Sequence, residues 1–317
     1  MSDDLDIFRL KLPNKLTYEH IGKVLEQVEP FAKSGTEAEE QYLELDFTST
    51  VFCSPTCITL LAACIERLWQ EGKFTSGHVL HSKNELAVRY LKRMDFFKEL
   101  SIPVEEDFER KEPIGFRPVT HVENEQTAPA VARDLVKAVS ERNKLDDAAT
   151  FALKTCFSEI VENVFYHADS PIDALTSIQA YKKYKGKPAR TELVIVDGGR
   201  GIKPVLAESR YADQITDDYS AISLAVQKNV TTTGDTNRGI GLWVASEVVR
   251  LNEGEMLILS NEGGMRVDKH GQHRVDDHYW PGTLVAIEFR MDKPLDTGPI
   301  YGSVEDWPDI DNRGFDF

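Results

Sequence analysis

Residues 157–168, FSEIVENVFYHA, contain the pair of polar side chains whose spacing best suits chemistry. Glu159 and Asn163 are four residues apart, so on a helix both point to the same side. A carboxylate beside an amide oxygen suits one metal ion together with one activated water or hydroxyl. The same spacing also fits an ordinary exposed helix face, so the pair alone does not identify a site.

Two glycine-containing segments lie downstream of this pair. The first, ELVIVDGGRGI, is a strand candidate that ends at Asp197 and is followed by Gly199 and Gly201. The second places the sequence Arg238-Gly239-Ile240-Gly241 immediately before a predicted helix. Glycines there let a polyphosphate approach bare backbone amides at a helix N-terminus, where the dipole favours negative charge.

Neither segment matches two better-known phosphate-binding motifs. No Gly-Lys-Ser/Thr sequence follows the glycines, which excludes a Walker loop. A dinucleotide fingerprint needs a helix directly after its glycines, and the sequence predicts no clear helix after Gly201.

The elements that must position these residues form a series of helices and strands in the second half of the chain. Hydrophobic periodicity predicts helices that begin near Thr127 and cover about residues 146–167, 219–228 and 241–251. Strands are predicted at 176–184, 191–197, 255–260 and 283–290. Residues 101–126 contain three prolines and alternating charges, which predicts a connection between domains.

The first hundred residues alternate strands with helices. Strand candidates are LDIFRLKL, YLELDF and GHVLHS. Helices are expected from about Thr17, from Ser54-Pro55, where Ser54 caps and Pro55 suits the first turn, and from a capping box at 82–85. Right-handed crossovers would join these strands into one mixed sheet with helices packed against it. The sequence therefore predicts an α/β protein.

Composition excludes several classes of protein. The 317 residues include 37 Lys and Arg against 53 Asp and Glu, for a formal net charge of −16. At roughly 150 residues per domain the length suggests two domains. The acidic balance disfavours general nucleic-acid binding, and no apolar stretch is long enough to span a bilayer. The acidic N-terminus lacks the features of a signal peptide, so we expect a cytoplasmic protein without a membrane partner.

Other candidate ligands carry less weight. The four cysteines, at positions 53, 57, 64 and 156, are expected to be buried thiols. His270, His273 and His278, with Asp276 and Asp277, are a weaker metal-ligand candidate in a polar hairpin loop. The stretch after residue 292 is acidic without a helical period and is expected to be a partly disordered tail.

In order and spacing, four motifs resemble the GHKL ATPase superfamily, which includes gyrase, MutL, histidine kinases and anti-sigma-factor serine kinases. They are EIVEN at 159–163, DGGRG at 197–201, RGIG at 238–241 and GT at 282–283. The resemblance covers about residues 120–292. It implies a two-layer α/β sandwich that binds ATP between its helices, under a mobile lid.

The resemblance also implies roles for residues that match the motifs. Asn163 would hold Mg²⁺, and Glu159 would act as general base or water positioner. Asp197 would accept a hydrogen bond from the adenine amino group, with Gly201 and Thr283 nearby. Gly199 belongs to the same nucleotide-binding motif.

Phosphate recognition is implied for the second glycine box. Residues from about 202 to 238 would form the lid, and Gly239 and Gly241 would lie at the phosphates. Arg238 would face the γ-phosphate, as an arginine does in sporulation-type anti-sigma kinases. The histidine-kinase subclass is disfavoured, because residues 101–145 contain His121 but not two long amphipathic helices.

The first domain resembles a STAS domain, the fold of anti-sigma-factor antagonists. In that family a strand ends in a turn like D-S-S-G-L, whose second serine the partner kinase phosphorylates. Here SPTCI occupies the turn, and MDFFKEL matches the family's closing helix. Ser54 replaces the aspartate, and Thr56 stands in the place of the phosphorylated serine, which makes Thr56 the candidate phosphoacceptor. A plain Ser-Pro helix start explains the same residues equally well.

These resemblances imply a STAS-like regulatory domain (1–110), a linker (111–126), a GHKL ATP-binding domain (127–292) and an acidic tail (293–317). The implied cofactors are ATP and Mg²⁺. The leading expectation is an ATPase or serine/threonine kinase that controls its own STAS domain or an unidentified protein partner. Fusion would place one domain at about millimolar effective concentration near the other. The alternatives are a nucleotide-gated protein-binding module without kinase activity and, more weakly, an ATP-closed homodimer clamp.

Overall fold

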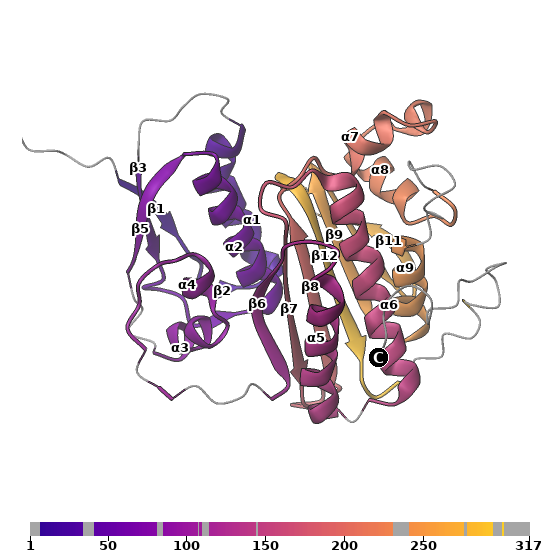
Figure 1. Cartoon of the computed structure of the whole chain (residues 1–317), viewed down its shortest axis with the longest axis horizontal. Helices are drawn as coiled ribbons and strands as arrows, with labels where there is room; N and C mark the ends of the chain where they lie inside the picture. Colours follow the sequence, from indigo (N-terminus) through magenta and orange to yellow (C-terminus); the bar gives the residue numbers. More distant parts are fainter. Residues whose placement is uncertain are drawn as a thin grey trace, which may run out of the picture.

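The computed structural model describes residues 7–33, 41–80, 85–106, 108–109, 114–143, 145–230, 241–275, 278–293 and 300. The chain is mixed α/β, as predicted, with a small sheet in the first third and a large sheet in the remainder (Figure 1). No described helix combines the length and apolar composition needed to cross a bilayer.

The small sheet consists of three strands, in the order β1 (Ile7–Lys11), β3 (Gln41–Asp46) and β5 (Phe74–Leu80). All three run parallel, where the sequence suggested a mixed sheet. A short parallel pair, β2 (Lys15–Leu16) and β4 (Phe52–Cys53), lies beside it. The helices are α1 (Tyr18–Lys33), α2 (Pro55–Gln70), α3 (Glu85–Arg93) and α4 (Phe96–Glu99). Residues 82–84 of the predicted capping box lie outside the described residues.

The large sheet has seven strands in the order β11-β10-β9-β12-β8-β7-β6, and every neighbouring pair is antiparallel. Its strands are β6 (Phe116–Val122), β7 (Ala174–Tyr181), β8 (Arg190–Asp197), β9 (Glu255–Asn261), β10 (Gly263–Asp268), β11 (Gly271–Arg274) and β12 (Trp280–Arg290). Helices α5 (Ala128–Asn143), α6 (Asp147–Asn163) and α9 (Gly241–Leu251) cover one face (Figure 1). A π-helical turn (Val164–Ala168) follows α6.

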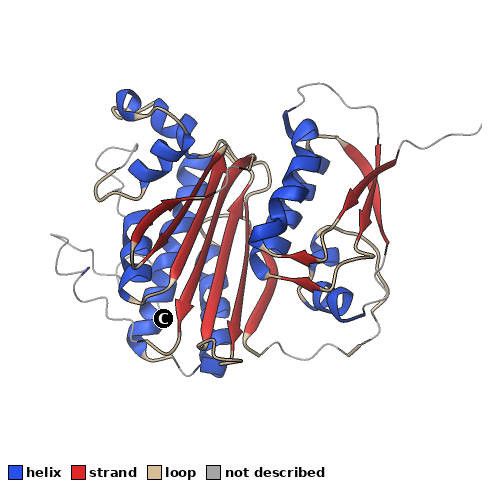
Figure 2. Cartoon of the chain, turned by 180° about the vertical axis from the view of Figure 1, so that it is seen from behind, coloured by secondary structure: helices blue, strands red, loops and turns tan. Residues whose placement is uncertain are grey.

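Helix α2 lies between the two sheets, with α1 beside it (Figures 1 and 2). The Ser54 side chain caps it by accepting from the backbone N–H of Cys57, and Pro55 occupies its first turn, as predicted. The helix is buried on almost every side, because it contacts a sheet on each flank. Residues of α2 share one hydrophobic cluster with the inward positions of β8, Val194 and Val196.

Alternation along each strand of the large sheet separates two cores. On β8, Val194 and Val196 face α2, whereas Leu193 and Ile195 face the α6 side. The same alternation occurs on β9, where Leu257 and Leu259 face α2. The sheet is therefore apolar on both faces.

Four further elements differ from the sequence-based expectations. Strand β6 lies within the predicted connection, where Pro118 is tolerated because β6 is an edge strand with a register shift between Arg117 and Thr120. Helix α7 (Ile202–Ala207) follows Gly201 directly, where no clear helix was expected. Strands β10 and β11 were not predicted, and they pair as a hairpin in the segment expected to be a polar hairpin loop. Helix α8 (Asp218–Ala225) confirms the predicted short helix, and residues 294–299 and 301–317 of the predicted tail lie outside the described residues.

Candidate functional site

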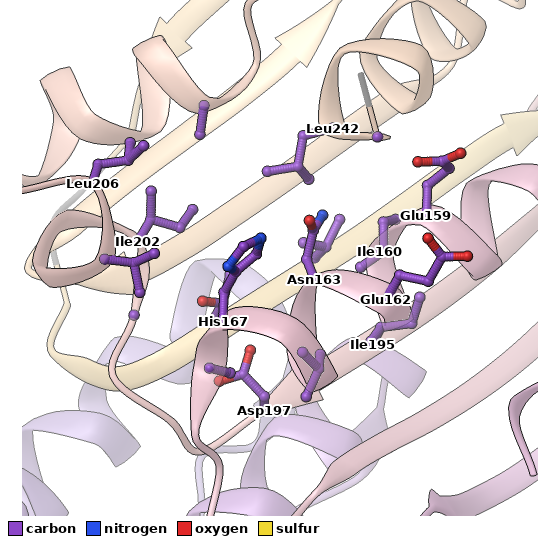
Figure 3. Close-up of a pocket in the computed structure, with 18 of the residues that line it drawn as sticks. Glu159, Ile160, Glu162, Asn163, His167, Ile195, Asp197, Ile202, Leu206 and Leu242 are labelled. Atoms are coloured by element: carbon purple, nitrogen blue, oxygen red, sulfur yellow. The ribbon is translucent and has the colours of Figure 1, made fainter. Parts of the chain in front are cut away.

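Helix α6 and its π-helical turn carry four polar side chains of one cavity, Glu159, Glu162, Asn163 and His167. Asp146 caps α6 by accepting from the backbone N–H of Ala149 at 2.8 Å. Glu159 and Asn163 lie one helical turn apart and both line the cavity, as the spacing predicted. His167, four residues further on, lines it as well, and burial lowers the pKa of its imidazole (Figure 3).

Asp197 lies at the end of β8 and supplies a buried carboxylate to the same cavity (Figure 3). It is 3% exposed, and its carboxylate accepts from the backbone N–H of Gly199 at 2.8 Å. The backbone N–H and hydroxyl of Thr283, its partner across the β8–β12 ladder, also donate to it. Desolvation raises the pKa of Asp197 to about 6, and these donors oppose the rise.

Close packing explains the glycines around Asp197. A Cβ on Gly199 would lie 2.1 Å from the carbonyl oxygen of Ala168. Gly201 has a φ of +78°, and a Cβ there would lie 2.0 Å from Oδ1 of Asn261. A side chain at position 199 would therefore displace the Ala168 backbone, and one at position 201 would combine a strained φ with displacement of the Asn261 side chain.

Gly241 begins α9 and packs against α6. A Cβ at this position would lie 3.0 Å from a carboxylate oxygen of Glu159. The absence of a side chain leaves the first turn of an 11-residue helix open beside Glu159. Arg238 and Gly239 lie outside the described residues.

The cavity has a volume of about 110 Å³ and combines a polar floor with apolar walls. The polar lining comprises Glu159, Glu162, Asn163, His167, Asp197 and Thr283. The apolar lining comes from seven elements and from Val230, and it comprises Ile160, Val164, Ala168, Ile195, Ile202, Val205, Leu206, Ala225, Val230, Leu242 and Val285. Sequence reasoning missed His167, although its spacing from Asn163 was a usable signal. It assigned the α7 residues to the expected lid at 202–238, and in the structure Ile202, Val205 and Leu206 line the cavity.

The structure brings Glu159, Asn163, Asp197, Gly201, Gly241 and Thr283 to one cavity, and Gly199 lies in the adjoining turn. These residues come from α6, from the end of β8, from α9 and from β12. The arrangement offers a buried acceptor at one end and a carboxylate beside an amide at the other. It suits a ligand that has a flat apolar part with a polar edge and a charged part.

Thr56 lies on the other face of the large sheet. It is 7% exposed at the start of α2, where its backbone N–H donates to Oε1 of Glu192 at 3.1 Å. Its hydroxyl donates to the same oxygen. On β8 the Glu192 side chain lies on the face opposite to those of Leu193 and Ile195. The sheet therefore separates the contact between Thr56 and Glu192 from the cavity.

The remaining candidate ligands form no metal centre within the described ranges. No group of three or more His, Cys, Asp or Glu residues there could hold a metal ion. His273 pairs with Asp268, whereas Asp276 and Asp277 lie outside the described residues. All four cysteines are free and buried, as predicted, and burial raises the pKa of the Cys53 and Cys64 thiols to about 12.

Neither a scan against protein-family models nor a search of curated proteins finds a match for this chain.

Proposed function

We propose that residues 127–292 form an ATP-binding domain of the GHKL type and that the cavity between α6, β8 and α9 binds Mg-ATP. The observation that carries the proposal is the environment of Asp197. The buried Asp197 carboxylate accepts from the backbone N–H of Gly199 and from the backbone N–H and hydroxyl of Thr283. A carboxylate has lone pairs for about four donors, so it can accept one more hydrogen bond, from the ligand. The exocyclic amino group of adenine is such a donor.

The walls of the cavity suit the rest of the base. Ile195, Ile202 and Leu206 provide apolar surface on both sides of the approach to Asp197. Gly201 keeps this approach clear, because any side chain there would meet Asn261. An adenine ring would bury apolar faces and direct one polar edge to the carboxylate.

The other end of the cavity suits phosphates and Mg²⁺. Asn163 offers an amide oxygen for the metal, which when bound would neutralise charge on the phosphates. Glu159 lies one turn earlier and would orient or deprotonate a water or hydroxyl. The first turn of α9 at Gly241 would donate backbone N–H groups to a phosphate. The resemblance adds Arg238 to this end.

We further propose that residues 1–110 form a STAS-like regulatory domain and that the whole chain is a nucleotide-dependent regulatory switch. Alternating strands and helices, and the Ser-Pro start of α2, support this assignment. Phosphoryl transfer to an unidentified protein partner is the leading output. The second candidate is a nucleotide-gated protein-binding module without kinase activity.

The position of Thr56 argues against phosphorylation of the chain's own first domain. For that domain it favours the second candidate, nucleotide-gated binding without kinase activity. Thr56 is buried against Glu192, on the opposite side of the sheet from the cavity. Transfer of a phosphoryl group to Thr56 within one chain would require α2 to leave the sheet. Intact-protein mass after incubation with Mg-ATP, followed by peptide mapping, distinguishes the outputs. Phosphate on Thr56 in the wild-type chain, absent in Asn163→Ala, would favour self-phosphorylation.

The ATP site is tested by nucleotide binding to Asp197→Asn. Calorimetry with a nonhydrolysable ATP analogue and Mg²⁺ is expected to show binding to the wild type and at least about tenfold weaker binding to the variant. The matched control is Asp46→Asn, because Asp46 also ends a strand, is buried and accepts from a threonine, Thr48. The control is expected to bind as the wild type does. Unchanged turnover of Mg-ATP in Glu159→Ala would count against a catalytic role for that residue.

A further inference from the structure

Arg67 of α2 reaches the turn that follows Asp197. Its Nη1 donates to the carbonyl oxygen of Gly198 and, at 3.3 Å, to that of Gly199. Its Nε donates to Oε1 of Glu71 at 2.8 Å, one turn further along the helix. The Arg67 side chain is 18% exposed, so its guanidinium is held largely inside the junction between the two sheets.

The same turn is held by groups of the large-sheet region. The indole N–H of Trp280 donates to the carbonyl oxygen of Asp197 at 3.0 Å. The backbone N–H of Gly198 donates to Oγ of Ser170 at 3.0 Å, and that of Arg200 donates to Ala168 at 2.7 Å. Arg67 differs from these groups because it belongs to the first third of the chain. It therefore ties the seating of α2 to the backbone that orients the Asp197 carboxylate.

Packing and charge strengthen this tie. A Cβ on Gly198 would meet the Arg67 side chain at Cδ, 3.4 Å away, so the methylenes lie against the turn as well. The positive charge of Arg67 also opposes the rise in the pKa of Asp197. Arg67 thus favours both the position and the ionised, hydrogen-bond-accepting form of that carboxylate.

We propose that Arg67 is a positioning residue for adenine recognition, through which the seating of α2 on the large sheet sets nucleotide affinity. The role rests on the proposed function, because Asp197 must be the group that reads the base. The coupling is reciprocal: whatever displaces α2 weakens nucleotide binding, and bound nucleotide holds α2 in place. The first third of the chain then changes nucleotide affinity through the packing of α2 on the opposite face of the large sheet, without contacting the ligand.

The test compares ATP with inosine triphosphate, which has a carbonyl oxygen in place of the adenine amino group. Both are titrated with Mg²⁺ into the full chain carrying Arg67→Met, which keeps the methylenes and removes the donors. ATP affinity is expected to fall about tenfold, whereas inosine triphosphate affinity changes less than about twofold. Arg67→Lys, which keeps the charge and one donor group, is expected to recover part of the preference.

The matched control is Arg250→Met on α9, which also removes an arginine paired within its own helix, with Glu247. It is expected to leave both affinities unchanged. An unchanged preference for ATP in Arg67→Met, or equal losses for the two nucleotides, would overturn the role of Arg67 while the ATP site stands. Failure of the wild type to bind either nucleotide would instead overturn the proposed function and the role of Arg67 with it.

A second variant covers the case in which Arg67→Met folds poorly. Glu71→Met leaves Arg67 in place and removes the acceptor that holds its Nε. A smaller loss of the preference for ATP in this variant supports the role of Arg67. The wild-type preference in a folded Glu71→Met chain would contradict it.

Discussion

Thr56 donates two hydrogen bonds to one carboxylate oxygen of Glu192, from the first turn of α2 to the strand β8. The two residues are 136 positions apart in the chain. Tyr181 of β7 donates to the other oxygen, Oε2, at 3.1 Å. Glu192 is thus a polar anchor within an otherwise apolar junction, and its donors come from both sides of that junction.

Thr56→Val is expected to lower the free energy of unfolding by about 1–3 kcal/mol, because Glu192 loses a donor that water replaces poorly. Thr56→Glu is expected to be more damaging, because it brings two carboxylates together in a buried place. Urea denaturation at pH 7 measures both effects. Thr120→Val, which removes a hydroxyl that bonds only two residues back, is the control and should change stability by less than about 0.5 kcal/mol.

Asp197 is expected to give opposite pH dependences for stability and for nucleotide binding. Its folded-state pKa is raised from 3.8 to about 6, so the folded chain holds a proton that the unfolded chain releases between these values. Stability of the unliganded wild type, relative to Asp197→Asn, should therefore fall by up to about 3 kcal/mol as pH rises from 4 to 6. ATP affinity should rise over the same range, because the ionised carboxylate accepts the adenine N–H more strongly than the protonated acid does. If the wild type and Asp197→Asn showed the same pH dependence of stability and the same pH dependence of ATP affinity, both expectations would be contradicted.

Gly201→Ala and Gly186→Ala form a matched pair. Both glycines have positive φ, +78° and +81°, but a Cβ at Gly186 meets nothing within 4 Å. Gly186→Ala should therefore cost about 1 kcal/mol from backbone conformation alone. Gly201→Ala should cost more than about 3 kcal/mol and abolish nucleotide binding, because its Cβ would also displace Asn261. Equal thermal shifts for the two variants would show that the close approach at Gly201 has no consequence.

His121 is expected to make stability depend on pH near neutrality. Its Nε2 pairs with Glu66 of α2 at 3.1 Å, and Glu99 and Asp173 also face it. The hydrogen bond to Glu66 raises the pKa of His121. Its stabilisation is therefore present below pH 6.5 and is lost as pH rises through the raised folded-state pKa. Urea denaturation between pH 6 and 8 should show a decline of about 1 kcal/mol in the wild type that is absent in His121→Asn. A decline of the same size in the variant would assign it to other groups.

Local signals in the sequence predicted most elements and the polar core of the site. The start of α2 and the inward face of α6 follow from capping residues and helical spacing, which act over a few positions. Asp197, Asn163 and Glu159 could be selected because each lies at a strand end or on one helix face. Strand β6 was missed because Pro118 and the neighbouring charges have the composition of a linker. Helix α7 was missed because it is six residues long and contains Pro204.

Long-range relationships could not be predicted in this way. Nothing near Arg67 in sequence indicates that it contacts Gly198, which is 131 positions away. The burial of Thr56 depends likewise on which face of β8 presents Glu192. Such contacts depend on how the two sheets pack against α2. Hydrophobic periodicity predicts which face of a helix or strand is buried, but it does not predict which other element packs on that face.

Because α2 is buried between two sheets, it belongs to the hydrophobic core of both regions of the chain. A fragment starting at β6 would leave Val194, Val196, Leu257 and Leu259 open to water, and an apolar sheet face of that kind promotes aggregation. A fragment ending after α4 would lack the partner for the other flank of α2. Loss or exchange of either region alone would expose this apolar surface, so we expect the two to be inherited together as one folding unit.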